Sequence, residues 1–249
     1  MIFQPPTPSY KLENHRAISS TMKNFPVYQT PENGDLVYLY FKGNNMDLGP
    51  LCDSLPPVAK VLNGTIYAVE YPGYGALSQM GPSEKGLYDA ADALWNYVTE
   101  EKCVCPAKIV VWGFSLGSLC ASYLASKYPS IHGVILESAF ASGMNVLSKH
   151  FSLVSRFLHG TPMRVPFSNI SHLCGSKNPR WRFCMFHGGA DDMISPIHHK
   201  DLKSAVPEQN FCVGRIFKES GHIFKTNDFM NMLIEIRQCM EADTPPSRK

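Results

Sequence analysis

A short apolar run followed by a serine between two glycines constrains the fold of this chain most strongly. Residues 109–112 read IVVW and residues 113–117 read GFSLG. A continuous apolar run of this length is typical of a strand covered on both faces, as in a parallel sheet. The residues from Leu116 to Tyr128 read as a helix that ends at Pro129. This order predicts a sharp turn that exposes Ser115 at the carboxyl end of a central strand.

Strand and helix signals alternate along most of the chain. Apolar, β-branched or aromatic runs predict further strands at 36–41, 64–70, 133–136, 182–187 and 211–217. Apolar residues at helical spacing predict helices at 53–62, 87–98 and 229–240. Strands that alternate with helices in this way predict an α/β fold with a doubly wound, mostly parallel sheet.

The same pattern suggests how the chain is divided. We assign residues 1–34 to an extended N-terminal segment with one edge hairpin, packed on the core, 35–241 to the α/β domain, and 242–249 to a disordered polar tail. An insertion at about 141–180 interrupts the alternation, and from Met144 to Leu158 its apolar residues recur at helical spacing. We interpret this stripe as packing on the core; the alternative is a small cap that lines an acyl pocket.

Composition argues against several classes of protein. The 249 residues carry 23 Lys and Arg against 21 Asp and Glu, so the net charge is +2 and nucleic acid is not an expected partner. There is no run of about 18 apolar residues and no hydrophobic leader, which predicts neither a transmembrane helix nor a signal peptide. Eight cysteines without paired CxxC motifs predict reduced thiols, no zinc or other metal site, and a cytoplasmic protein.

Two later loops offer the partners that a nucleophilic serine requires. A hydroxyl is a weak nucleophile, so a histidine must accept its proton and a carboxylate must orient that histidine. Asp191 follows the strand at 182–187 and its glycine turn, and His222 follows the strand at 211–217. The order Ser115, Asp191, His222 is the order of a triad on an α/β-hydrolase fold. We therefore predict these three as catalytic residues, with Asp192 as the alternative acid.

Other histidines are expected to have structural roles. His187 lies on the strand side of its glycine turn, so we favour a hydrogen bond to that loop over catalysis. His198 and His199 follow Ser195-Pro196, a helix-start signature, and are predicted to be exposed helical residues.

Five short motifs stand in a fixed order. They are FKGNNMDLG at 41–49, YPGYG at 71–75, PSEK at 82–85, GFSLG at 113–117 and HGGAD at 187–191. Together they resemble the α/β-hydrolase-domain-containing 17 and 13 branch of the serine hydrolases, and FQPPTPSY at 3–10 is similar to the segment before that family's core. The resemblance runs from about residue 3 to about residue 240. It implies an α/β-hydrolase fold, a membrane-associated cytosolic hydrolase, Ser115 as nucleophile, Asp191 as acid and His222 as base.

The resemblance also suggests an oxyanion hole. The loop Gly43-Asn44-Asn45 matches the family's His-Gly-Asn-Ala turn, so the backbone N–H of Asn44 is expected to join that of Leu116 as a donor. Lys42 departs from the family pattern, which has histidine there; this change either alters how the loop is held or places a cation beside the site. A second departure concerns the N-terminus, because the family's acylated cysteine cluster has no counterpart in the first 51 residues.

These observations predict a cofactor-independent serine hydrolase that works through an acyl-enzyme. The resemblance implies an acyl thioester of a lipidated protein as substrate, because the best-known branch removes palmitoyl groups from protein cysteines, and it implies peripheral membrane association. The alternatives within enzymes are a carboxylesterase or lipid hydrolase and, less favoured, a serine peptidase. The alternative outside enzymes is a catalytically silent scaffold of the same fold.

Overall fold

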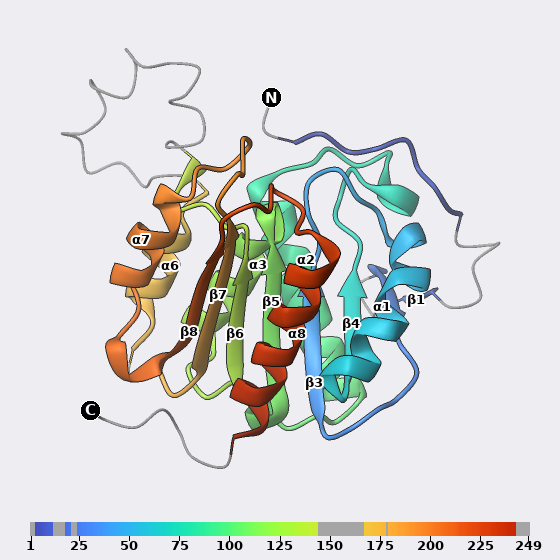
Figure 1. Cartoon of the computed structure of the whole chain (residues 1–249). Helices are drawn as coiled ribbons and strands as arrows, with labels where there is room; N and C mark the ends of the chain where they lie inside the picture. The colour runs from blue at the N-terminus through green and yellow to red at the C-terminus, as the bar shows by residue number, and fades with distance from the viewer. Residues whose placement is uncertain (1–2, 12–17, 21–23, 144–166, 178, 243–249) are drawn as a thin grey trace.

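The structure, a computed structural model, describes residues 3–11, 18–20, 24–143, 167–177 and 179–242 (Figure 1). Within these residues lies one eight-stranded sheet with the order β1-β2-β4-β3-β5-β6-β7-β8. Its strands are β1 (Ile18–Ser20), β2 (Pro26–Gln29), β3 (Leu36–Phe41), β4 (Gly64–Val69), β5 (Ile109–Phe114), β6 (Gly133–Glu137), β7 (Arg182–Gly188) and β8 (Phe211–Phe217). The strands from β3 to β8 pair in parallel, and β1 and β2 add an antiparallel edge. The predicted α/β-hydrolase fold is therefore confirmed.

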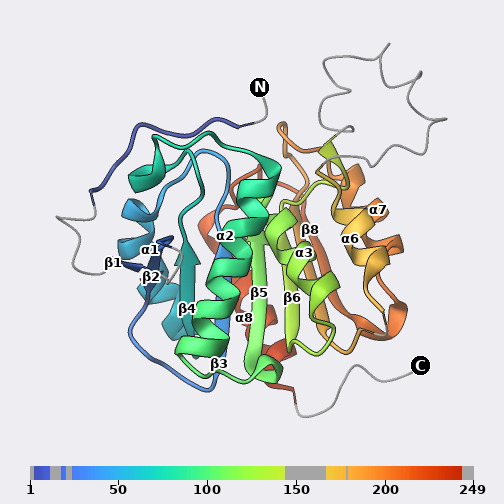
Figure 2. The ribbon, with the colours of Figure 1, turned by 180° about the vertical axis from the view of Figure 1, so that it is seen from behind.

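Helices cover both faces of the sheet (Figures 1 and 2). The helices are α1 (Leu48–Leu62), α2 (Glu84–Asn96), α3 (Ser118–Lys127), α6 (Asn169–Gly175), α7 (Ile197–Ser204) and α8 (Thr226–Glu241). Alternate residues of one strand enter two different cores: Tyr38 and Tyr40 pack toward α1 and α8, whereas Leu39 packs toward α2 and α3. This two-sided burial explains why the central strands are apolar without alternation.

Two helices begin at other residues than their apolar spacing predicts. Helix α1 starts at Leu48 instead of residue 53, because the Asp47 side chain accepts a hydrogen bond from the Gly49 N–H and caps the helix, which then continues through Pro56 and Pro57. Helix α3 starts at Ser118, after a 3-10 turn over Ser115–Gly117. Leu116 and Gly117, the first residues of the predicted helix, therefore belong to the sharp turn and not to α3.

The two ends of the chain and the insertion are described in part. The apolar stripe from Met144 to Leu158 and the tail 243–249 lie outside the described residues. The described end of the insertion is α6, which packs on α3, and the described N-terminal residues 3–11 run extended along the edge of the sheet where the parallel strands end (Figure 1). The predicted domain boundaries stay predictions.

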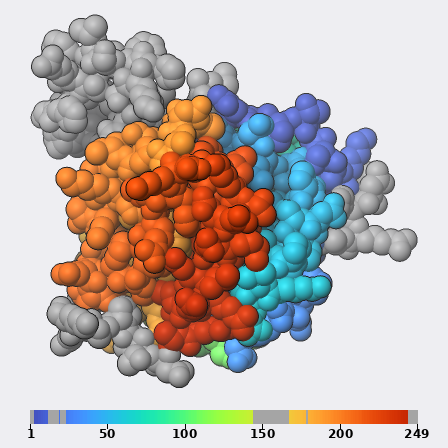
Figure 3. Space-filling view, in the orientation of Figure 1, coloured from blue at the N-terminus to red at the C-terminus, as the bar shows by residue number. Residues whose placement is uncertain are grey.

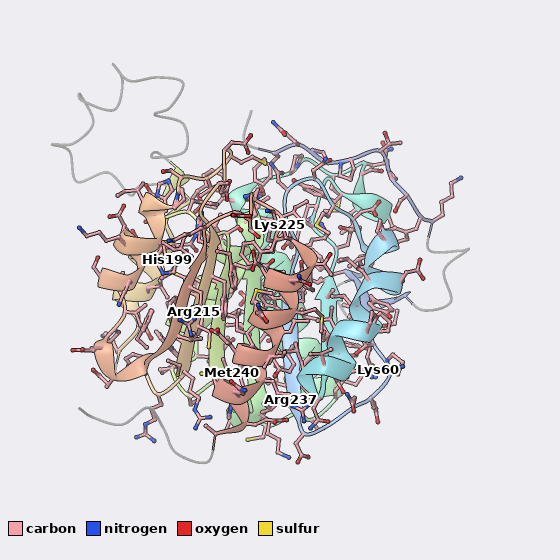
Figure 4. The ribbon with its side chains drawn as sticks, in the orientation of Figure 1. Lys60, His199, Arg215, Lys225, Arg237 and Met240 are labelled. Atoms are coloured by element: carbon pink, nitrogen blue, oxygen red, sulfur yellow. The ribbon has the colours of Figure 1, made fainter. Side chains whose placement is uncertain are left out.

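Helix α8 lies over the face of the sheet that Figure 1 shows, between α1 and β8, and runs from the carboxyl ends of the parallel strands toward their other ends. Lys225 lies at its start, near the carboxyl ends of the strands, and Met240 lies near its far end (Figure 4). In the space-filling view the red and orange surface of α7 and α8 adjoins the cyan surface of α1 (Figure 3). The His222 loop immediately precedes α8, and the Ser220 hydroxyl of this loop donates to Asp228 of the helix at 2.7 Å.

Candidate active site

Ser115 occupies a strained turn between β5 and α3. Its φ of 51° lies in the left-handed region that side chains other than glycine seldom adopt. The flanking glycines leave the space for the turn: a Cβ at Gly113 would lie 2.5 Å from the Gly117 carbonyl oxygen, and one at Gly117 would lie 2.0 Å from that of Phe41. The Ser118 hydroxyl donates to the Ser115 carbonyl at 2.6 Å and holds the turn from below.

The structure brings Ser115, His222 and Asp191 together in one hydrogen-bonded chain. The Ser115 hydroxyl lies 2.9 Å from His222 Nε2, and His222 Nδ1 lies 2.8 Å from Asp191 Oδ2. Because a carboxylate accepts, Nδ1 carries the hydrogen and Nε2 is left to accept the serine proton. This geometry is the one that proton transfer from a nucleophilic serine requires.

Asp191 is held as an anion although it is buried. The N–H groups of Met193 and Ile194 donate to its Oδ1 at 2.9 and 2.8 Å, and His187 Nε2 lies 3.4 Å from its Oδ2. Burial acts to raise the pKa of Asp191, but the nearby His187 side chain and the hydrogen bonds from His222 and Ile194 outweigh it and hold the pKa well below its usual range. Asp192, the alternative acid, is exposed.

Two neighbours that the sequence did not point to hold His222 in place. The Ser138 hydroxyl donates to the His222 backbone carbonyl at 2.9 Å, and Ser138 itself has a φ of 45°. The Phe114 ring lies beside the imidazole, with 5.2 Å between ring centroids. The only available signal for Ser138 was its place directly after a strand, and that signal names no partner.

The loop expected to supply an oxyanion donor lies against the serine turn. A Cβ at Gly117 would also come within 2.7 Å of the Lys42 carbonyl oxygen, and one at Gly43 within 2.8 Å of the Phe114 ring. The Asn44 side-chain oxygen accepts from the Tyr74 hydroxyl at 2.5 Å and from the Gln4 N–H at 2.9 Å. The Asn44 side chain therefore anchors its own loop, and the backbone N–H groups of Asn44 and Leu116 stay the predicted donors.

Lys42 anchors the same loop through a buried ion pair. Its ammonium lies 2.8 Å from Glu70 Oε1, and both side chains are fully buried. The ammonium also lies over the rings of Tyr71 and Tyr74, at 3.9 and 4.2 Å from their centroids. Burial lowers the pKa of Lys42, and the neighbouring Glu70 carboxylate opposes that effect. The structure thus shows how Lys42 contacts its neighbours, and the effect of the change from histidine stays a prediction.

The three other histidines near the site divide into one confirmed and two wrong predictions. His187 Nε2 donates to the Ile194 carbonyl at 2.9 Å, so it bonds the loop as expected. His198 and His199 are only 5% and 8% exposed, so the prediction of exposure is wrong. Helix α7 turns His199 inward (Figure 4), where its ring meets that of His187 with 6.5 Å between centroids. Burial, with His187 and Lys203 adding to it, lowers the pKa of His199 to about 4.

A third buried carboxyl group, Glu137, lies on the strand next to β5, and the sequence analysis did not single it out. Glu137 ends β6 and accepts a hydrogen bond from the Trp112 indole N–H at 3.0 Å. Burial raises the pKa of Glu137 to about 7, and the bond from Trp112 only partly opposes this.

In the described residues, no three His, Cys, Asp or Glu side chains form a group that could hold a metal ion. Among the same residues, none of the helices has the length and apolar character that a membrane span requires.

Comparison with known proteins finds relatives that share part of the chain. It is 34% identical over 166 residues to alpha/beta hydrolase domain-containing protein 17B of Xenopus tropicalis, a match that covers 67% of this chain and 54% of the relative. It is 33% identical over 147 residues to an uncharacterized membrane protein of Saccharomyces cerevisiae, covering 59% of this chain and 50% of the relative. The chain thus spans about half the length of these relatives. No protein-family model matches it.

Solved structures share the fold over nearly the whole chain. An esterase from Pyrococcus furiosus superposes with a TM-score of 0.65 at 13% identity, and the match covers 96% of this chain and 98% of the esterase. At that identity the likeness shows a common fold, and the chemistry has to be argued from the side chains.

Proposed function

Because this chain is an α/β-hydrolase related to the alpha/beta hydrolase domain-containing 17 proteins, we propose that it is a serine hydrolase that cleaves acyl thioesters or esters through an acyl-enzyme. One observation carries the proposal: the continuous hydrogen bonds from Ser115 through His222 to Asp191. Each of the three side chains follows a parallel strand, and the strained backbone of Ser115 presents its hydroxyl to the imidazole.

The proposed reaction has two halves. His222 Nε2 takes the Ser115 proton while the serine oxygen attacks the acyl carbonyl, and the Asp191 carboxylate stabilises the imidazolium. The oxyanion is held by the N–H groups of Asn44 and Leu116. Its collapse breaks the bond to the leaving group, which takes the proton from His222 and departs as a thiol or an alcohol, so that His222 is again free to act as a base. A water that gives its proton to His222 then attacks the acyl-enzyme, which releases the carboxylic acid and restores the Ser115 hydroxyl.

We place the substrate among lipid-modified proteins, with S-palmitoylated cysteine as the first candidate. Exposed apolar side chains on the loops that carry Asp191 and His222, and at the first residue of α7, support this choice. Met193 is 60% exposed, Ile197 59% and Ile223 80%, although large apolar side chains are normally buried. Exposed apolar side chains of this kind suit an acyl chain or the surface of a membrane that presents one, so the proposal includes peripheral membrane association.

Labelling with a fluorophosphonate tests the hydrolase proposal directly. The wild-type protein is expected to become covalently labelled and Ser115→Ala to lose the label. Ser126→Ala is the matched control, because Ser126 lies on α3 and its hydroxyl bonds the Tyr123 carbonyl of the same helix. The absence of labelling in the folded wild type would favour the silent scaffold.

Substrate class is tested with paired acyl thioesters and oxoesters of graded chain length. Faster turnover of long-chain thioesters, lost in Ser115→Ala, would support the thioesterase proposal. Faster turnover of short oxoesters would instead identify a carboxylesterase, and cleavage of peptide amides would identify a peptidase.

A further inference from the structure

We propose that Tyr71 and Tyr74, the two tyrosines of the YPGYG turn after β4, are positioning residues for the loop Gly43–Asn45. In the sequence this turn is one of the five ordered motifs, and no role is assigned to its two tyrosines. In the structure its side chains reach the loop after β3, which is expected to supply the Asn44 oxyanion donor. The inference rests on the proposed function, because a positioned donor matters only where an oxyanion forms.

The two tyrosine hydroxyls bind on either side of Gly43. Tyr71 donates to the Lys42 backbone carbonyl at 3.1 Å, and Tyr74 donates to the Asn44 side-chain oxygen at 2.5 Å. Both rings are buried, and they pack edge to face with 5.7 Å between centroids. The turn thus holds the residue before Gly43 by its backbone and the residue after it by its side chain.

A buried charge fixes the same two rings. The Lys42 ammonium lies over both of them and pairs with Glu70, the residue directly before the turn. Glu70 Oε1 also accepts from the Tyr71 N–H at 3.2 Å, and Oε2 accepts from the Leu48 N–H at 3.1 Å. Lys42 beside the Gly43–Asn45 loop, the YPGYG turn and the start of α1 therefore all contact the Glu70 carboxylate.

The N-terminal segment, residues 3–11, also contacts Glu70 and Asn44. The Tyr10 hydroxyl donates to Glu70 Oε2 at 2.9 Å, and the Gln4 N–H donates to the same Asn44 oxygen that Tyr74 binds. Residues 3–11 run along the edge of the sheet above these loops (Figure 1). The Asn44 side-chain oxygen thus accepts hydrogen bonds from both the YPGYG turn and the N-terminal segment, and a shift of its loop would lengthen them.

Removal of single hydroxyls tests the inference with two independent readouts. Tyr74→Phe and Tyr71→Phe keep the ring under the Lys42 ammonium and delete one hydrogen bond each. For a displaced backbone donor we expect kcat to fall about tenfold while KM changes less than about twofold, because the oxyanion contact forms only in the transition state. Amide hydrogen exchange in the segment 42–46 is expected to become faster in both variants.

Tyr38→Phe is the matched control. Tyr38 is a fully buried tyrosine of β3, and within the described residues its hydroxyl has no hydrogen-bond partner. This variant is expected to leave both kcat and the exchange of segment 42–46 unchanged. A double-mutant cycle adds a further test: if Tyr74 acts through Asn44, Tyr74→Phe should have little additional effect in an Asn44→Ala background.

The outcomes separate the inference from the proposed function. If wild type turns over substrate but Tyr71→Phe and Tyr74→Phe behave like Tyr38→Phe in both readouts, the inference is overturned. If wild type is inert toward the fluorophosphonate while segment 42–46 loosens in both variants, the hydrolase proposal fails and the positioning of the loop stands. Slower turnover without faster exchange would contradict positioning and point to a direct contact with substrate.

Discussion

Two buried carboxyl groups at the ends of neighbouring strands have pKa values that are shifted in opposite directions. Asp191 follows β7 and Glu137 ends β6, and both are almost inaccessible to solvent. Asp191 accepts hydrogen bonds from two backbone N–H groups and from His222, with His187 close by, and its pKa lies well below the usual range. For Glu137 the indole N–H of Trp112 is the donor, and burial raises its pKa to about 7.

The two carboxyl groups differ in their hydrogen-bond donors and in how deeply they are buried. Removal from water disfavours the carboxylate at both positions. At Asp191 the converging donors more than offset this cost, whereas at Glu137 they do not. An acid that must stabilise an imidazolium has to remain charged at neutral pH, and only Asp191 is built to do so.

The largest expected effect comes from removing the charge of Asp191. Asp191→Asn keeps the shape of the side chain but cannot hold His222 in the tautomer that accepts the serine proton. We expect kcat to fall by about 10⁴-fold, as for the loss of the acid in a serine triad. Steady-state kinetics on an activated ester would measure it.

Asp192→Asn is the control for that experiment. Asp192 is the next residue in the chain and is exposed, so its charge should not matter to the imidazole. Its kcat is expected to stay within about twofold of wild type, since surface charges contribute little. Equal losses in the two variants would show that the donors around Asp191 do not select the acid.

A third buried carboxylate, Glu70, differs from these two because it is paired with a cation. Glu70 accepts from Tyr10, Leu48 and Tyr71 and also faces the Lys42 ammonium. Lys42→Met leaves that carboxylate buried without its counter-charge, and we expect the free energy of unfolding to fall by about 3–5 kcal/mol. Urea unfolding at pH 7 would measure the loss.

Neutralising Glu70 as well provides the internal control. In Lys42→Met with Glu70→Gln no unpaired charge remains, so part of the lost stability should return. A double variant that is less stable than Lys42→Met alone would mean that the hydrogen bonds to Glu70, rather than its pairing with Lys42, hold the loop.

The proximity of the three proposed catalytic side chains could be predicted because it follows from topology. Ser115, Asp191 and His222 each come directly after a strand, and the carboxyl ends of parallel strands meet at one edge of the sheet. Periodicity and strand order are properties of short segments, so a single sequence contains them.

The contacts that support these residues could not be predicted in the same way. The Lys42–Glu70 pair and the bond from Ser138 to the His222 carbonyl join segments 28 and 84 residues apart, and nothing local specifies such partners. The prediction that His199 is exposed was wrong for a related reason. The segment 197–204 is polar, but the His199 ring packs against His187, which lies on β7. Side-chain packing between distant segments decides these cases.

The pH dependence of the free energy of unfolding tests the raised pKa of Glu137. Burial raises the pKa of Glu137 from 4.5 to about 7, so folding favours its protonated form. That contribution is fully present below pH 4.5 and is lost as the pH rises through 7. Glu137→Gln stays neutral and can still accept the Trp112 bond, so at pH 8.5 it should be more stable than wild type by up to about 3 kcal/mol.

Chemical unfolding at pH 4.5 and pH 8.5 would show this crossover. The two proteins are expected to differ little at the lower pH, where wild-type Glu137 is mostly protonated, and to diverge at the higher one. An equal difference at both pH values would mean that the substitution acts through packing and that the protonation state of Glu137 is not what separates it from Asp191.

The smallest expected effect comes from removing one contact of Asp191. His187→Leu deletes the imidazole 3.4 Å from Oδ2 and leaves the Ile194 carbonyl without that bond, but Met193, Ile194 and His222 still donate to the carboxylate. We expect the loss of one buried hydrogen bond to cost about 1–2 kcal/mol of stability. Since Asp191 stays ionised at neutral pH, kcat should remain within about threefold of wild type.

Urea unfolding and kinetics on the same preparation of His187→Leu would separate the effect on stability from the effect on kcat. A loss of kcat as large as that of Asp191→Asn would mean that His187, rather than the set of donors as a whole, keeps the acid charged.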